Sequence, residues 1–137
     1  MALTHIVIFK YKSDTDEAQK TAVTEAFLAL RNQCLSPANF TSPGTPYILN
    51  IIAGSNNSSE DPAKGYQVSR HVNPFCDHLS QHLICSTRQH AYIVTFASVQ
   101  HRDYYVDHDP AHNAFKSLVG PLLEKVVVTD FIDGVWN

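Results

Sequence analysis

Residues 4–12 read Thr-His-Ile-Val-Ile-Phe-Lys-Tyr-Lys, a run rich in the β-branched and aromatic residues that favour strands. Because side chains alternate across a strand, one face would carry alternate residues from 5 to 11, and the opposite face would carry Ile6 and Ile8. Both faces are apolar, and a strand that is apolar on both sides is covered on both sides. The stretch therefore predicts a sheet with a packed layer against each face.

The next segment predicts an amphipathic helix of about five turns, which ends near Ser36-Pro37. Ser13 or Asp14 is the expected N-cap, and Asp16 and Glu17 suit the positive end of the helix dipole. Small and apolar side chains recur at steps of three and four residues, and this expected buried stripe is Ala18, Ala22, Ala26, Phe27, Leu30 and Cys34.

The remainder of the chain predicts three more strands, over residues 47–53, 90–96 and 125–132. A short helix is expected over 99–106, and another begins at Asp109-Pro110, with the aspartate as N-cap and the proline in the first turn. Its expected buried stripe is Ala111, Phe115, Leu118, Val119 and Leu122. The order β-α-β-β-α-β is the ferredoxin-like arrangement, an α+β fold.

This arrangement places both helices on one face of the sheet and leaves the other face bare. Four strands of this length expose roughly 500 Å² there, which is near the upper limit for an apolar patch on a soluble monomer. A symmetric second copy is the simplest cover for such a face. The sequence therefore predicts a homodimer in which the sheet of one copy covers the sheet of the other.

Composition limits the class of protein further. The 137 residues are 44% hydrophobic and 17% charged, which fits one globular domain spanning residues 1–137. The net charge of −3 and the lack of a basic cluster argue against a nucleic-acid partner. No apolar run is long enough for a membrane span, and no secretory leader is recognised. Three cysteines without a pairing pattern favour a reducing, cytoplasmic location.

Residues 68–89 fit the rest of the pattern poorly. They show no sustained period, and with the preceding loop they would make an unusually long connection between adjacent strands. Four potential metal ligands occur there, but their spacing matches no standard zinc pattern, so we predict no metal site. These four residues are Cys76, His78, His82 and Cys85.

A second hypothesis treats residues 68–89 as an atypical insertion produced by translation of a retained intron. Val68-Ser69 can be encoded by the usual start of a spliceosomal intron, and Gln89 by its usual end, CAG. Excision would join Gln67 directly to His90 and leave a hairpin of ordinary length.

Outside this insertion, the chain resembles the stress-responsive dimeric α/β barrel family (Dabb), and within it polyketide cyclases of the olivetolic acid cyclase type. The signature Pro110-Ala111-His112, together with a histidine on the first strand, is fairly specific for the family and much less specific for one activity. Where the cyclases have His-Pro-Ala-His, residues 108–112 read His-Asp-Pro-Ala-His. The other matching stretches are residues 4–12, 17–31, 64–66, 90–99 and the last strand into Asp130-Phe131.

The resemblance implies two ferredoxin-like subunits whose sheets form a barrel, and a catalytic pair of a tyrosine and a histidine. His112 takes the position of the catalytic histidine. Tyr105 takes the tyrosine position, but one extra residue precedes His112, so Tyr104 is the alternative. His5 and His90 fall on the strand histidines of the family and would support the pocket.

The residues themselves suggest how this pair would work. His112 would lie in the first turn of its helix, where the positive helix end lowers the pKa of the imidazole and keeps it neutral, as a general base requires. The phenol of Tyr105 could donate a hydrogen bond to a developing enolate oxygen. A surface histidine and a tyrosine at the barrel rim are the simpler interpretations. The expected pocket lining is Val7, Phe9, Tyr92, Val94 and Phe115.

These expectations lead to three hypotheses of function. The first is a cofactor-free acid–base enzyme that closes a polyketide-like or other β-dicarbonyl substrate by an aldol or Claisen reaction, a lyase of secondary metabolism. The second is a non-catalytic stress-responsive dimer that binds a small apolar metabolite in the same barrel. The third is a cofactor-independent monooxygenase, since related barrels include such enzymes.

Overall fold

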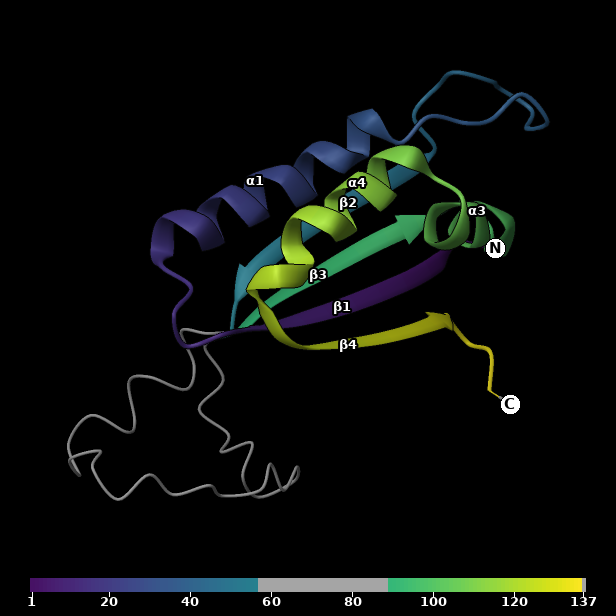
Figure 1. Cartoon of the computed structure of the whole chain (residues 1–137). Coiled ribbons are helices and arrows are strands. Elements are labelled where there is room, and N and C mark those ends of the chain that lie inside the picture. The colour runs from purple at the N-terminus through teal and green to yellow at the C-terminus, as the bar shows by residue number, and fades with distance from the viewer. Residues whose placement is uncertain (57–88, 137) are drawn as a thin grey trace, which may run out of the picture.

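The computed structural model describes residues 1–56 and 89–136, and it contains one four-stranded sheet with its helices on one side (Figure 1). The predicted order of elements is confirmed, and the chain has the ferredoxin-like α+β fold. In chain order the elements are β1 (Leu3–Tyr11), α1 (Glu17–Gln33), β2 (Ile48–Ser55), β3 (Gln89–Phe96), α3 (Val99–Asp107), α4 (Pro110–Val119), a 3₁₀ turn (Gly120–Leu122) and β4 (Leu123–Ile132).

The sheet has the strand order β2-β3-β1-β4, and each pair of neighbouring strands is antiparallel. The central strand β1 sets the register: His5 lies opposite Val94 on β3 and opposite Asp130 on β4. Because residues that lie opposite each other point to the same face, this register brings side chains from three strands together under the helices.

The core lies between the sheet and the helix layer. Alternate residues of β1 from Leu3 to Tyr11 are buried there, and their neighbours in sequence are half-buried or exposed. Aromatic rings fill this layer: Phe27 stacks on Tyr92 with ring centroids 4.2 Å apart, and Phe9 stacks on Phe115 at 6.2 Å. The helices thus cover the face that carries His5 and Phe9.

The opposite face of the sheet is apolar and uncovered in the single chain, as predicted. Ile8 and Val127 lie opposite each other on this face and are 36% and 45% exposed. Ile52 on β2 and Phe131 on β4 extend the same face and are 53% and 47% exposed. Apolar side chains therefore span this face from one edge strand to the other.

The predicted N-cap of α1, Ser13 or Asp14, was wrong, because the helix begins at Glu17 and Asp16 is its cap. Asp16 caps the helix: its side chain accepts from the Gln19 N–H at 2.7 Å, and the Gln19 side chain accepts from the Asp16 N–H at 2.9 Å. This reciprocal pair satisfies two backbone donors, which neither earlier candidate does. The buried stripe is also rotated from the predicted one, because larger side chains bury more apolar area than alanine. Its members are Lys20, Val23, Phe27 and Leu30.

Helix α4 begins as predicted, with Asp109 as N-cap and Pro110 in the first turn. Phe115 and Val119 form its buried stripe, while Leu118, which was expected to be buried, is 54% exposed. None of the helices in the described ranges is both long and apolar enough to cross a membrane. The proposed insertion at residues 68–88, with its four potential metal ligands, lies outside the described residues.

Candidate functional site

Tyr105 and His112 meet where α3 turns into α4. Their rings stack with centroids 3.8 Å apart and an angle of 17° between the ring planes. The turn is fixed by Asp109, whose carboxylate accepts from the backbone N–H groups of Ala111 at 2.8 Å and His112 at 3.0 Å. The two residues singled out from the sequence are therefore brought into direct contact.

The hydrogen bond of His112 fixes which ring nitrogen carries the proton. Nδ1 lies 2.7 Å from the backbone carbonyl oxygen of Tyr105, and a carbonyl can only accept, so Nδ1 donates. Nε2 is then left with its lone pair. Burial lowers the pKa of His112 from 6.5 to about 4, and the nearby Lys116 and His5 also lower it. The imidazole is therefore neutral at pH 7, and burial is the largest cause of its low pKa.

Tyr105 brings a buried hydroxyl group to the same place. The residue is fully buried, and its hydroxyl is the one buried side-chain polar atom in the described part of the chain that has no hydrogen-bond partner. Burial raises the pKa of the phenol, with Cys34 and Asp109 acting in the same direction, so the group stays protonated. An unsatisfied buried hydroxyl costs about 1–3 kcal/mol, which a ligand oxygen could recover.

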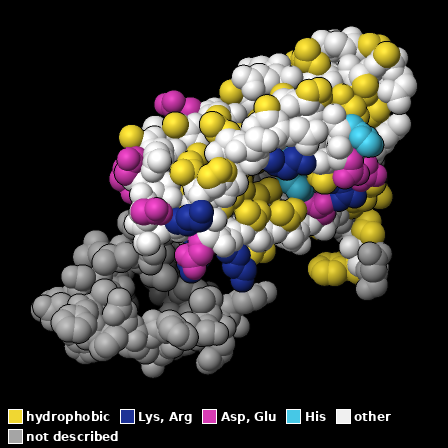
Figure 2. Space-filling view, in the orientation of Figure 1, with side chains coloured by type: hydrophobic (Ala, Val, Ile, Leu, Met, Phe, Trp, Pro, Cys, Tyr) yellow, Lys and Arg dark blue, Asp and Glu magenta, His cyan; other side chains and the backbone are white. Residues whose placement is uncertain are grey.

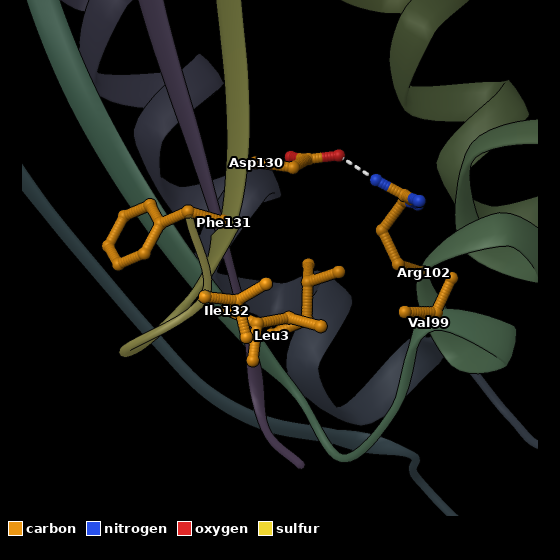
Figure 3. Close-up of a pocket in the computed structure, with 7 residues that line it drawn as sticks. Leu3, Val99, Arg102, Asp130, Phe131 and Ile132 are labelled. Atoms are coloured by element: carbon orange, nitrogen blue, oxygen red, sulfur yellow. Dashed lines mark hydrogen bonds and ion pairs between the residues drawn. The ribbon is translucent and has the colours of Figure 1, made fainter. Parts of the chain in front are cut away.

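His5 lies on the other side of Tyr105, with the two rings edge to face and their centroids 5.9 Å apart. Its Nδ1 is 2.5 Å from a carboxylate oxygen of Asp130, its partner in the β1–β4 register. The second oxygen of Asp130 accepts from Arg102 on α3, as Figure 3 shows. An Arg-Asp-His chain thus runs from α3 across the edge strand to the buried imidazole.

The site lies within one subunit, which corrects the expected location between the sheets of two copies. His5 points to the helix-covered face because it pairs with Val94 and Asp130 on that face. Tyr105 and His112 belong to helices packed on the same face. The sequence left this choice open because both faces of β1 are apolar.

The expected pocket lining stays a prediction, and the structure places its members in the core. All five are packed between the sheet and the helices, and none of them lines either of two clefts found among the described residues. Some of their rings contact one another, as Phe9 does with Tyr92 and Phe115. The five residues are Val7, Phe9, Tyr92, Val94 and Phe115, with exposures of 6%, 4%, 0%, 0% and 5%.

His90 belongs to a separate polar cluster and does not join His112. Its Nδ1 lies 3.3 Å from the hydroxyl oxygens of Tyr11 and Thr24 and 3.4 Å from that of Tyr92. Burial lowers the pKa of this imidazole, and the positive charge of Lys20 lowers it further.

Tyr104, the alternative to Tyr105, is half-buried and packs against Phe40 and Tyr47. Tyr105 is therefore the tyrosine beside His112.

Exposed apolar side chains lie next to the site, on the helix side of the edge strand β4. Val126 and Val128 are 45% and 53% exposed, and they lie opposite Phe9 and Val7 in the register. Figure 2 shows a recess between the helix layer and this edge, where a histidine lies among apolar side chains with a basic side chain next to it. The exposure of the two valines shows that no helix in residues 1–56 and 89–136 buries this stretch of β4, so a ligand could reach the site along them.

Sequence analysis missed Asp130, Arg102 and the two β4 valines. The pairing of β1 with β4 could have signalled Asp130, because antiparallel register places it opposite His5. Arg102 gave no signal, since its contact depends on how α3 is placed. Within residues 1–56 and 89–136, no three metal-ligating side chains converge.

Fold and site together define a ferredoxin-like α+β protein whose helix-covered face holds a buried tyrosine–histidine pair. The chain belongs to the stress-responsive A/B barrel family, whose domain model matches residues 3–73 and 76–133. A comparison with curated proteins found no match.

Three solved structures illustrate the likeness of fold. A protein of Arabidopsis thaliana is 18% identical over 98% of each chain, with a TM-score of 0.66. The hydroxynitrile lyase of Passiflora edulis is 20% identical over 99% of this chain and 97% of its own, with a TM-score of 0.63. A dimeric ferredoxin-like protein of unknown function from Thermobifida fusca is 18% identical over 96% and 90%, with a TM-score of 0.57.

Proposed function

We propose that this protein is a cofactor-free acid–base enzyme that makes or breaks a carbon–carbon bond beside a carbonyl group. The observation that carries the proposal is the buried hydroxyl of Tyr105, which has no partner among the described residues and belongs to a ring stacked on a neutral imidazole. A donor without an acceptor next to a base without a proton is the arrangement that an enolate-forming reaction uses.

The proposed reaction is the closure of a β-dicarbonyl compound, as in a polyketide cyclase. Nε2 of His112 removes a proton from the carbon between two carbonyls, and the electron pair moves to a carbonyl oxygen. The hydroxyl of Tyr105 donates to this enolate oxygen. The enolate carbon then attacks a second carbonyl of the same molecule, a carbon–carbon bond forms, and the new alkoxide takes the proton back from His112.

The substrate we propose combines a polar dicarbonyl head with an apolar tail. Val126 and Val128 offer exposed apolar surface directly beside the site, where the tail would exclude water. Their position explains how an apolar substrate could bind beside the closely packed core. These two valines thus add an exposed apolar surface to the pocket-supporting residues expected from the sequence.

A lyase among the structurally similar proteins suggests that the reverse reaction, the cleavage of a carbon–carbon bond, should be tested as well. In that direction His112 removes a hydroxyl proton, the carbonyl reforms, the adjacent carbon–carbon bond breaks, and the leaving carbon takes the bonding electron pair and then the proton from His112. The same pair of side chains would serve, because a base and a hydrogen-bond donor are needed in both directions.

We also propose that the protein is a homodimer, joined through the apolar open face of its sheet. The uncovered Ile8, Ile52, Val127 and Phe131 support this assembly, as does the dimeric state named for the Thermobifida fusca relative. Such an interface leaves the site accessible, because the site lies on the other face of the sheet.

The test supplies the protein with a linear poly-β-ketoacyl thioester and follows the cyclised product by chromatography and mass spectrometry. We expect His112→Ala and Tyr105→Phe each to lower the rate about hundredfold or more. Tyr104→Phe is the matched control and should retain the rate. Equal turnover in all four proteins, wild type included, would refute the proposal.

One observation favours a non-catalytic alternative, in which the protein only binds a small apolar metabolite. The core rings behind the site stack on one another, and the exposed apolar surface lies along β4, where a bound molecule would remain partly in solvent. This alternative predicts that wild type and His112→Ala bind an apolar diketone equally and that neither converts it.

A further inference from the structure

The ion pair between Arg102 and Asp130 joins two elements that the chain separates widely. Arg102 lies in the first turns of α3, and Asp130 lies near the end of the edge strand β4. The side chains are each 23% exposed, so the pair is partly shielded from solvent. A contact that ties a helix to an edge strand limits how far that strand can move.

Asp130 uses its two carboxylate oxygens for different partners. Oδ1 is 2.5 Å from Nδ1 of His5, and Oδ2 accepts from Nη1 of Arg102. Because a carboxylate can only accept, Nδ1 of His5 is a protonated nitrogen that donates to Asp130. The guanidinium on the outer oxygen fixes the rotation of the carboxylate, and this rotation keeps the inner oxygen on His5.

The surroundings of the pair explain why the guanidinium is needed. Figure 3 shows Arg102 and Asp130 facing each other across the end of a cleft whose other walls are apolar. The cleft has a volume of about 270 Å³, and its other lining residues are Leu3, Val99, Phe131, Ile132 and Val135. Among these neighbours Arg102 alone could hold the outer oxygen, so without it the carboxylate would turn toward solvent.

We propose that Arg102 is a positioning residue: acting through Asp130, it keeps the proton of His5 on Nδ1 and the ring edge-on to Tyr105. Its effect on turnover rests on the proposed function, whereas its effect on the His5 tautomer does not. Two imidazoles then flank Tyr105, and each is held through its Nδ1, that of His112 by a backbone carbonyl. His5 differs in being held by a charged group.

Arg102 has a second carboxylate partner, which supplies a matched control. Its Nε donates to Asp103, the next residue on the same helix, at 2.7 Å, and the Asp103 side chain is 56% exposed. Asp103→Asn weakens a contact of Arg102 without touching Asp130. If Arg102 acted only within α3, Asp103→Asn would change the tautomer of His5 as much as the loss of the Asp130 contact does.

The experiment measures the tautomer of His5 by ¹⁵N NMR at pH 8, where an ordinary imidazole is neutral. In the wild type and in Asp103→Asn, we expect Nδ1 protonated and Nε2 unprotonated. In Arg102→Met, which keeps the aliphatic stem and loses the charge, we expect a mixture of tautomers. Arg102→Lys should restore most of the wild-type signal. A wild-type tautomer in Arg102→Met overturns the proposal.

Turnover provides the second readout. Arg102→Met should lower kcat about ten- to hundredfold with little change in KM, because a displaced group lowers catalysis more than binding. If Arg102→Met does not fold, Asp130→Asn gives the same test of the tautomer, since the amide can donate to His5 and reverse its preference. If Arg102→Met alters the tautomer of His5 while His112→Ala leaves turnover unchanged, the proposed function is rejected and this inference stands.

Discussion

The aromatic ring of Tyr105 covers the imidazole of His112 at a centroid distance of 3.8 Å, and the backbone carbonyl of the same tyrosine accepts from Nδ1 of that histidine. One residue thus fixes both the orientation and the tautomer of the other. The contact spans the turn capped by Asp109, so a local signal in the sequence positions the central pair of the site.

The unsatisfied hydroxyl of Tyr105 predicts an unusual effect on stability. Tyr105→Phe removes a buried group without a partner, so we expect the free energy of unfolding to stay level or to rise by about 1–3 kcal/mol. Tyr47→Phe is the control of opposite sign, because the buried Tyr47 hydroxyl donates to Asp109 at 2.7 Å. Its loss should cost about 1–3 kcal/mol. Urea unfolding measures both; equal losses would mean that the Tyr105 hydroxyl has a partner in the free protein.

The low pKa of His112 predicts a loss of stability in mild acid. Its pKa is about 4 in the folded chain against an ordinary value of 6.5, so between these values the unfolded chain binds the extra proton. Stability therefore falls as the pH drops from 6.5 to 4, by up to about 3 kcal/mol from this group. His112→Asn should lack this component, while a substitution of the exposed His108 by asparagine should keep it. Urea unfolding at pH 7 and pH 4.5 compares the three proteins.

Local signals in the sequence were sufficient for the elements of the fold. The period of residues 4–12 gave β1, and Asp109-Pro110 gave the start of α4, because strand alternation and helix capping depend on near neighbours. The choice of covered face was not local. Ile6 and Val7 are both strongly apolar, so which of them meets the helices depends on packing between distant elements, and the sequence alone did not place the expected pocket lining in the helix-covered core.

The candidate site was predictable to a different extent. His112 and Tyr105 were found through the family resemblance, and the structure places them in contact. Arg102 could not be found, because its role depends on a contact with Asp130, 28 residues away on a different element. An exposed-looking arginine on a short helix has no period or motif that marks such a contact in advance.

Asp109 is expected to matter more for stability than an ordinary helix cap. It is 1% exposed and holds two backbone N–H groups of α4 as well as the hydroxyl of Tyr47. Asp109→Ala leaves these donors unpaired in the core, and we expect a loss of about 3 kcal/mol or more. Asp16→Ala, which removes the exposed cap of α1, should cost about 1 kcal/mol. Thermal and urea unfolding measure both losses. Equal losses for Asp109→Ala and Asp16→Ala would show that the burial of Asp109 is unimportant.

We propose that residues 68–89 are dispensable for folding, as the retained-intron hypothesis requires. Gln89 anchors the start of β3, where its backbone carbonyl and side chain accept from Asn56 at 2.9 and 2.8 Å. Deletion of residues 68–89 places Gln67 at this position, so the same side chain is available. A shorter connection is also easier to close, by roughly 0.6 kcal/mol for each halving.

The deletion variant should therefore fold with equal or slightly higher stability, as measured by urea unfolding and by the NMR spectrum of residues 1–56. A variant in which a glycine–serine linker of equal length replaces the segment separates the effect of length from that of sequence. An unfolded deletion variant would show that the segment belongs to the fold. Sequencing of mature transcripts tests the origin directly, since codons 68–89 in every message would exclude an intron.

Val127 and Val128 are neighbours on β4 that test the two faces of the sheet separately. Val127 lies opposite Ile8 on the open face, whereas Val128 lies opposite Val7 on the helix side, beside the site. Val127→Asp places a charge in the proposed dimer interface and should shift the protein to a monomer in analytical ultracentrifugation. Val128→Asp should leave the dimer intact and weaken binding of an apolar substrate about tenfold or more. The reverse pattern would mean that the helix side of β4 forms the interface, and a substrate would then have to reach Tyr105 and His112 by another route.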